Sequence, residues 1–477
     1  MRKKINLCSG WRFSDVFEER YIDSEMTEAD EVTLPHSVCE TPLHYFDEID
    51  YQKLSTYQKN LFAPDEWQDK RIVLTFDGAA HRAEVYLNGR VIKSHDCGYT
   101  AFSVELTDKL NINEDNLITV KLDSRETLDQ PPFGFVIDYM TYSGLYRDVY
   151  LEITEKSAFT DVFFKPEVNN ISETSENGNG KLSVQFSITD SADRDLFNNE
   201  LSVRVGMTPY FTDATDNVEK TVDQKTVDQK IIEQKLSYEM LQKGELDRSI
   251  MDNKLPDYLE VSGQVSDIRL WSPEKPSLYT VSIELIGNGE IIDTYTSTIG
   301  FRQAEFRADG FYLNGQKYKI RGMNRHQSFP YVGYAMPESM QRYDAEILKN
   351  EIGVNAVRTS HYPQSHYFID ECDKIGLLVF TEIPGWQHIG SKKWQDQAVY
   401  NVYDMVTQYR NHTSIILWGV RINESEDNDG FYSRTNRLCH LIDPTRQTGG
   451  VRCRTADKNT NIQEDVFTYN DFVHSGQ

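Results

Sequence analysis

Long apolar runs are missing from the sequence. No segment reaches the roughly 18 consecutive apolar residues that a membrane-spanning helix needs. The basic N-terminal segment MRKKINLCSGWRF is not followed by the apolar stretch of about 7–15 residues that a secretory signal has. We therefore expect neither a membrane partner nor secretion, and we expect a cytoplasmic protein.

Cysteine is scarce and scattered. The six cysteines are Cys8, Cys39, Cys97, Cys372, Cys439 and Cys453. None of them has CxxC spacing, so the sequence indicates neither a zinc site nor a dense disulfide framework.

Basic residues are fewer than acidic ones. Lys and Arg number 50 against 75 Asp and Glu, which gives a net charge of −25. Such a surface repels nucleic acids and anionic lipids, so we expect no nucleic-acid partner and a neutral substrate. Aromatic residues make up 12% of the chain, which is typical of a globular protein, and 477 residues predict about three domains.

Residues 1–154 read as a β-sandwich. Short alternating runs such as RIVLTFDG, AEVYLNGRVI, NLITVKLD and YRDVYLEI indicate half-buried strands. Asn88-Gly89 predicts a two-residue hairpin turn, because both residues take a positive φ at low cost.

Residues 155–300 repeat this character in KLSVQFSIT, ELSVRVGM and LYTVSIELI, which predicts a second, smaller sandwich. Polarity rises over residues 213–261, and TVDQK occurs in tandem at 221–225 and 226–230. We interpret 213–261 as a polar surface insertion that carries no chemistry.

Residues 301–477 alternate short apolar strands with helical patterns, which is typical of βαβ units and a parallel sheet. The predicted strands are KYKIRGMN, NAVRTS, LLVFTEI, SIILWGVRINE, TGGVR and FTYND. These are about six strands of a (β/α)8 barrel, a fold that needs roughly 250 residues, so we expect an incomplete TIM barrel.

Polar residues gather where these strands end. The first strand runs into Arg325-His326, the second into His361, the third carries Glu382, and the fourth runs into Asn423-Glu424. Functional groups of such barrels lie at the C-terminal ends of strands, so we expect these side chains to share one rim. Glu424 is a candidate general acid or base among them; the alternative is a glutamate that caps the helix predicted over 430–442.

Two long segments carry a family resemblance. NAVRTSHYP at 355–363, continued by QSHYFIDECDKIGLLVF, and RNHTSIILWGVRINE at 410–424 resemble the signature segments of glycoside hydrolase family 2. YLNGR and SGLYRDVYL resemble its jelly-roll sugar-binding domain, and LWSPEKPSLYTV its immunoglobulin-like domain. The resemblance implies a retaining hydrolase that cleaves terminal β-D-galactosides, with Glu424 as general acid and then base.

The resemblance also implies roles for further residues. Asn423 would bind the sugar 2-hydroxyl, and His326 and His361 would contact the galactose ring. Arg358, buried in its strand, would support the catalytic glutamates together with Glu382. Asp138, six residues before Gly144, would reach the sugar hydroxyls from the jelly roll; the alternative is an exposed loop aspartate.

A loop after the third strand departs from the family pattern. Where the family has a glutamate and a histidine that bind Mg²⁺, this chain has Trp386 and His388. The loss of a carboxylate makes Mg²⁺ doubtful, so no metal or other cofactor is assigned. Trp386 is instead a candidate aromatic platform for the sugar, the alternative being core packing, and His388 a supporting residue.

The second departure from the family pattern is the lack of a recognisable nucleophile. Retaining glycosidases need a second carboxylate about 5–5.5 Å from the acid/base, and in this family it follows the seventh strand. Glu464, Asp465 and Asp471 lack that context. We therefore expect the nucleophile beyond residue 477 and expect the chain alone to be inactive.

Alternatives stay open at this point. The substrate is a β-linked oligosaccharide or galactoside, but a β-glucuronidase or β-mannosidase of the same family has the same motifs. A non-catalytic carbohydrate-binding protein is an alternative from another class. The sequence also leaves a homo-oligomer open.

Overall fold

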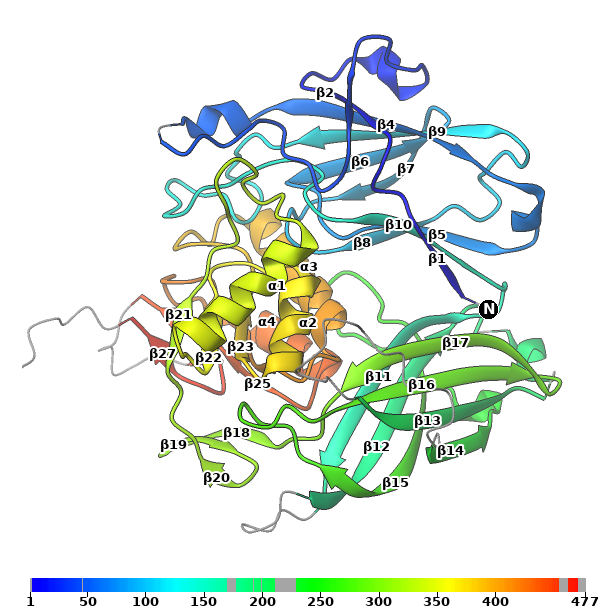
Figure 1. Ribbon diagram of the computed structural model, residues 1–477, viewed down its shortest axis with the longest axis vertical. Helices are drawn as coiled ribbons and strands as arrows, with labels where there is room; N and C mark the ends of the chain where they lie inside the picture. The colour runs from blue at the N-terminus through cyan, green and yellow to red at the C-terminus, as the bar shows by residue number, and fades with distance from the viewer. Residues whose placement is uncertain are drawn as a thin grey trace, which may run out of the picture.

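The computed structural model describes residues 2–44, 46–169, 177–191, 193–198, 200–210, 229–453 and 462–470. Two β-sandwiches pack against a helix-bearing C-terminal part, which lies beside both of them (Figure 1). No helix in the described part of the chain is long and apolar enough to cross a membrane. The predicted fold class, two sandwiches followed by an incomplete barrel, is confirmed.

The first sandwich has sheets of four and six strands. The smaller sheet has the order β1 (Lys3–Asn6), β10 (Val149–Thr154), β5 (Arg71–Phe76) and β8 (Phe102–Glu105). The larger one has the order β3 (Asp30–Val32), β2 (Trp11–Ser14), β4 (Leu54–Phe62), β9 (Asp115–Asp123), β6 (Arg82–Leu87) and β7 (Arg90–His95). Alternate residues of β6 are buried, as its period-2 pattern predicts, and Asn88-Gly89 turns into β7 with φ of 49° and 82°.

The second sandwich has sheets of three and four strands. The three-stranded sheet has the order β11 (Phe159–Val168), β12 (Asn177–Ile188) and β15 (Leu259–Arg269). The four-stranded sheet has the order β14 (Gln229–Lys235), β13 (Ser202–Tyr210), β16 (Leu278–Gly287) and β17 (Glu290–Ile299). A separate apolar core lies between them, with Val184, Val203 and Ile283 fully buried. Single-turn helices in the two sandwiches are η1 (Glu19–Ile22), η2 (Glu48–Tyr51), η3 (Asp65–Trp67), η4 (Arg194–Asn198) and η5 (Tyr238–Met240).

The interpretation of 213–261 as a surface insertion is wrong for its second half. Residues 211–228, with most of the TVDQK repeat, lie outside the described part of the chain. From Gln229 on, however, β14 pairs with β13, and β15 lies in the other sheet. Ile250 and Met251 are buried in the core of the C-terminal domain, and Nε of Arg434 donates to the Ile250 carbonyl at 2.9 Å. Two adjacent apolar residues show no period, so the sequence pattern could not reveal this contact.

A small hairpin sheet, β18 (Ala304–Arg307), β19 (Gly310–Leu313) and β20 (Gln316–Lys317), precedes the barrel. Five parallel strands follow: β21 (Gly322–Asn324), β22 (Ala356–Thr359), β23 (Leu378–Glu382), β24 (Ile415–Gly419) and β25 (Gln447–Gly449). Beyond them β26 (Val451–Arg452) pairs with β27 (Thr468–Tyr469). The helices are α1 (Glu338–Glu346), which continues into the π-helical turn η6 (Ile347–Glu351), then α2 (His366–Ile375), α3 (Lys392–Tyr409) and α4 (Asp429–Ile442). Parallel pairing brings all strand ends to one edge, where the polar residues lie.

Candidate active site

A buried ionic network joins the ends of β22, β23 and β24. Nε of Arg358 pairs with Oε1 of Glu382 at 2.8 Å, and its Nη2 donates to Oδ1 of Asn423 at 2.7 Å. Nδ1 of His361 lies 2.9 Å from Oε2 of Glu382. Burial alone would raise the pKa of Glu382, but the charge of Arg358 and the hydrogen bond from His361 outweigh it and hold the pKa below its usual value. Glu382 is therefore an ionised anchor for two predicted site residues, Arg358 and His361, and Arg358 in turn holds Asn423.

Glu424 stands at the rim of this network. It is half-buried, follows Asn423 at the end of the β24 segment, and its N–H donates to the Val451 carbonyl at 2.9 Å. It does not cap α4, because Oδ1 of Asn428 accepts the N–H of Phe431 at 3.0 Å in that position. The carboxyl group of Glu424 is thus left for another role.

The first sandwich reaches into the site through residues 124–148. The Tyr139 ring lies 5.2 Å from the His326 ring and 5.9 Å from the His361 ring, measured between centroids. Burial lowers the pKa of His326 to about 4, with His361 and Arg358 adding to the effect, so His326 is neutral at neutral pH. Burial and the charge of Glu424 raise the pKa of Asp138, while His361 lowers it. Asp138 is exposed, and its charge interacts with those of Glu424 and His361.

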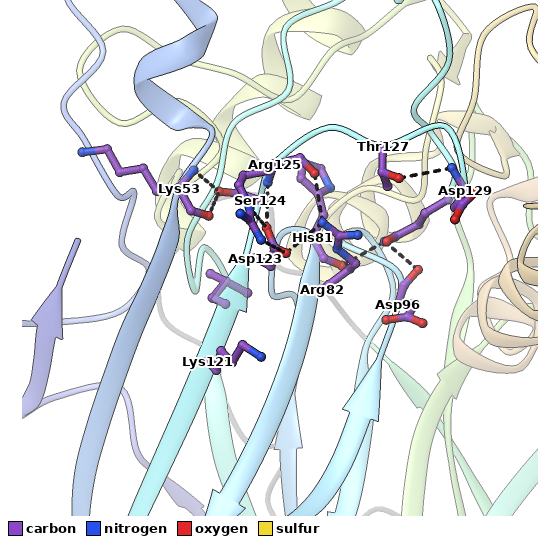
Figure 2. Close-up of polar contacts among 12 residues, drawn as sticks. Lys53, His81, Arg82, Asp96, Lys121, Asp123, Ser124, Arg125, Thr127 and Asp129 are labelled. Carbon is purple, nitrogen blue, oxygen red and sulfur yellow. Dashed lines mark hydrogen bonds and ion pairs between the residues drawn. The ribbon is translucent and has the colours of Figure 1, made fainter. Parts of the chain in front are cut away.

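The base of residues 124–148 is tied to the sandwich (Figure 2). Nε and Nη2 of Arg125 donate to the two carboxylate oxygens of Asp123, both at 2.9 Å, and Nη2 of Arg82 pairs with the same carboxylate at 2.9 Å. The Lys53 N–H donates to Oγ of Ser124 at 3.1 Å. These contacts tie the start of residues 124–148 to the first sandwich.

Trp386 and His388 do not form a cation site. The indole Nε1 of Trp386 and Nε2 of His388 are buried and have no hydrogen-bond partner among the described residues. An indole N–H is only a donor, so it cannot replace a ligating carboxylate. The His388 ring packs edge-on against Phe135 at 5.3 Å and Trp394 at 5.7 Å, which makes it a packing residue of the loop. Trp386 is half-buried, and its backbone forms an isolated parallel β-bridge with that of Asn423.

The sequence analysis missed three residues near the site, which are Tyr139, Gln387 and Asn470. The position of Tyr139 beside Asp138 could have revealed it. Gln387 donates from Nε2 to Oε2 of Glu424 at 3.1 Å, and Nδ2 of Asn470 donates to Oε1 of the same carboxylate. Gln387 also lines a cavity of about 440 Å³, together with Leu128, Asp129, His388, Ile389, Gly390, Ser391 and Glu426. Glu424 therefore has a neutral amide on each carboxylate oxygen, and one of these amides belongs to a residue that lines the cavity.

Comparisons with protein families match nearly the whole chain. The model described as "Glycosyl hydrolases family 2, sugar binding domain" matches residues 9–155. "Glycosyl hydrolases family 2" matches 158–302, and "Glycosyl hydrolases family 2, TIM barrel domain" matches 304–474.

Similar proteins are consistent with these matches. The chain is 41% identical to a β-galactosidase of Thermoanaerobacterium thermosulfurigenes, over 100% of the chain and 61% of that protein. It is 40% identical to a β-galactosidase of Thermoanaerobacter pseudethanolicus over 99% of the chain and 58% of that protein, and 30% identical to a β-glucuronidase of Bacteroides fragilis over 98% and 63%. The chain thus spans about three fifths of the length of these relatives.

Solved structures share the architecture. A β-glucuronidase of Bacteroides uniformis, 26% identical, superposes with a TM-score of 0.77 over 95% of this chain and 52% of its own. A putative β-galactosidase of Bacteroides fragilis, 23% identical, superposes with a TM-score of 0.77 over 98% of this chain and 67% of its own. Domain matches in family order, relatives along the whole chain and the polar rim of the barrel agree, and the chain belongs to glycoside hydrolase family 2.

Proposed function

We propose that residues 1–477 supply the sugar-recognising and proton-donating part of a retaining β-galactosidase. The observation that carries this proposal is the placement of Glu424: a carboxyl group that caps no helix, beside Asn423, at a rim where His326, His361 and Asp138 also gather. In the first step Glu424 protonates the leaving oxygen, and in the second it takes a proton from the attacking water.

The other residues serve the sugar. Asn423, held by Nη2 of Arg358 at 2.7 Å, presents its amide to the 2-hydroxyl, a contact that strengthens in the transition state. Neutral His326 offers hydrogen bonds to hydroxyls without adding charge. The cavity that Gln387 lines is a candidate place for the leaving group.

The charges of the site favour a neutral sugar. Arg358 is balanced by Glu382, with which it pairs at 2.8 Å, so it is not free to bind a sugar carboxylate. Asp138 adds a negative charge near Glu424. A hydroxyl can donate to Asp138, whereas a glucuronate carboxylate would be repelled by it. A β-glucuronidase is the second candidate because the Bacteroides fragilis relative, 30% identical, has that name.

The nucleophile is proposed to come from polypeptide outside residues 1–477. Oε1 of Glu464 accepts from Nε of Arg421 at 3.0 Å, and Oδ2 of Asp465 accepts from the Thr448 N–H at 2.8 Å, so both are committed to structural contacts. Asp471 lies outside the described residues. One carboxyl can protonate a leaving group but cannot also form the glycosyl-enzyme intermediate. We therefore expect no turnover by residues 1–477 alone.

The experiment compares aryl β-galactoside, β-glucuronide and β-mannoside as substrates of the complete enzyme. We expect the highest kcat/KM on the galactoside, with the β-anomer of galactose formed first in the NMR spectrum. A higher kcat/KM on the glucuronide would favour the second candidate. Binding of galactosides without any turnover would instead indicate a non-catalytic carbohydrate-binding protein.

A further inference from the structure

The loop after β23 brings a neutral amide to the proposed acid/base carboxyl. Gln387 and Glu424 both have a left-handed backbone, with φ of 57° and 53°. The Gln387 N–H donates to the Asn423 carbonyl at 2.7 Å, which sets the loop beside the end of the β24 segment. Residues other than glycine adopt a left-handed backbone at a cost in free energy. Its occurrence at two facing positions therefore points to a constraint on where their side chains lie.

The contact between them is direct. Nε2 of Gln387 lies 3.1 Å from Oε2 of Glu424, within the range of a good hydrogen bond. Nδ2 of Asn470 occupies the other oxygen, Oε1. The carboxyl is thus oriented from two sides by groups without charge.

A neutral amide suits a group that changes its protonation state. A cation on this carboxyl would stabilise the ionised form, although the first step needs the proton on Glu424. The amide of Gln387 has N–H donors for the carboxylate and a carbonyl acceptor for the carboxylic acid. It can therefore keep a hydrogen bond to Glu424 before and after the proton is transferred to the leaving oxygen.

We propose that Gln387 is the positioning residue of Glu424, and that its amide does at this loop what a bound divalent cation would otherwise do. The donor set supports this, since Trp386 has no lone pair for a cation and the His388 ring is packed between Phe135 and Trp394. The inference rests on the proposed function, because it gives Gln387 a role only if Glu424 transfers the proton.

Gln387→Met in the complete enzyme tests the proposal, since methionine keeps the length of the side chain but removes the hydrogen bond. We expect kcat on a galactoside with a poor leaving group, such as phenyl, to fall about 10–100-fold with KM nearly unchanged. With dinitrophenol, which leaves without a proton, the loss should stay under about threefold. Gln395→Met is the matched control, because Gln395 donates to the Gly390 carbonyl of the same loop and makes no hydrogen bond to Glu424 in the described structure.

Two further measurements separate the outcomes. In a Glu424→Gln background, Gln387→Met should add no further loss, because residues that act as a unit are not additive. EDTA should leave the wild-type kcat on the phenyl galactoside unchanged. The proposal is overturned if the Gln387→Met loss is equal for both leaving groups, if the two variants are additive, or if EDTA abolishes a turnover that Mg²⁺ restores. A wild-type enzyme that hydrolyses no β-glycoside would overturn the proposed function instead.

Discussion

The two sandwiches flank the same barrel but contribute to it in different ways. The first one packs Tyr139 against the rings of His326 and His361 and contacts Gln327 and Pro363 through Arg147. The second meets the barrel ahead of β24, where Arg302 donates to the Thr413 carbonyl at 2.6 Å and Asn411 donates to the Val162 carbonyl at 2.8 Å. The site therefore depends on the long connection between β9 and β10, whereas the second sandwich supports the barrel away from the strand ends. Similar architectures acquire different roles through their loops.

A pair of arginines, one from the first sandwich and one just after the last strand of the second, tests this comparison with the largest expected effect. Arg147 donates to the Pro363 carbonyl at 2.9 Å and Arg302 to that of Thr413 at 2.6 Å. Arg147→Met and Arg302→Met should each lower the free energy of unfolding by about 2–4 kcal/mol, because a charged donor and several buried acceptors lose their partners. Urea denaturation of each variant measures this loss.

Only Arg147→Met should also change catalysis. Gln327 and Pro363 neighbour His326 and His361, so we expect about a tenfold lower kcat on the galactoside in the complete enzyme. Arg302→Met, assayed below its unfolding transition, should keep wild-type kcat. Equal kinetic losses in the two variants would mean that both sandwiches shape the site.

Asp138→Ala probes the loop itself. We expect kcat/KM on galactosides to fall about 10–100-fold, because a hydrogen bond from a sugar hydroxyl to a charged acceptor is lost. Glu167→Ala, which removes an acidic side chain from the second sandwich, is the control and should have no kinetic effect. Wild-type kinetics for Asp138→Ala would make Asp138 an ordinary exposed loop aspartate.

Removing a carboxylate charge should have opposite effects on stability at the contacts of the barrel with the first and the second sandwich. On α3, facing the first sandwich, burial raises the pKa of Asp404 to about 7 despite a hydrogen bond from Thr100. The folded state then binds more protons than the unfolded state between about pH 4 and 7, so this carboxyl lowers stability as pH rises through that range. Asp404→Asn should raise the free energy of unfolding at pH 8 by about 1–2 kcal/mol and change it little at pH 4.

Asp161→Asn, at the second sandwich, should instead lower the free energy of unfolding at pH 8, because it breaks the ion pair with buried Arg410. Denaturation curves at both pH values distinguish the two cases. A destabilising Asp404→Asn would show that the ionised form is the one the interface favours.

The smallest effect is expected at the edge of the first contact. Lys393 pairs with Asp129 at 3.3 Å, with 76% and 59% of the side chains exposed. Exposed ion pairs contribute little, so Lys393→Ala should change the free energy of unfolding by less than about 0.5 kcal/mol. A larger change would mean that this bridge, and not the buried contacts, holds the loop against the barrel.

The fold could be predicted largely from local pattern. Alternating burial in β6 and the parallel strands from β21 to β24 follow directly from the residue periods. The pattern failed at Ile250 and Met251, which are too few to show a period and are buried only because the barrel core accepts them.

The site was predictable where a motif or a strand end marked it, and less so elsewhere. Glu382 ends β23, and Asn423 and Glu424 come after β24, so the parallel pairing of these strands brings the three residues to one edge. Gln387 gives no such signal, because its contact with Glu424 depends on left-handed backbone at both residues. His388 was predicted to support the site, but in the structure its ring packs against Phe135 and Trp394.

The most direct test of the central assignment is the stereochemistry of azide rescue in Glu424→Ala. In the complete enzyme this variant should hydrolyse only galactosides with good leaving groups, because it lacks the acid. Added azide should accelerate turnover and yield the β-galactosyl azide, since a small anion enters the space left by the carboxyl and attacks the glycosyl-enzyme from that face. An α-galactosyl azide, or no response to azide, would contradict the role of Glu424 as the acid/base.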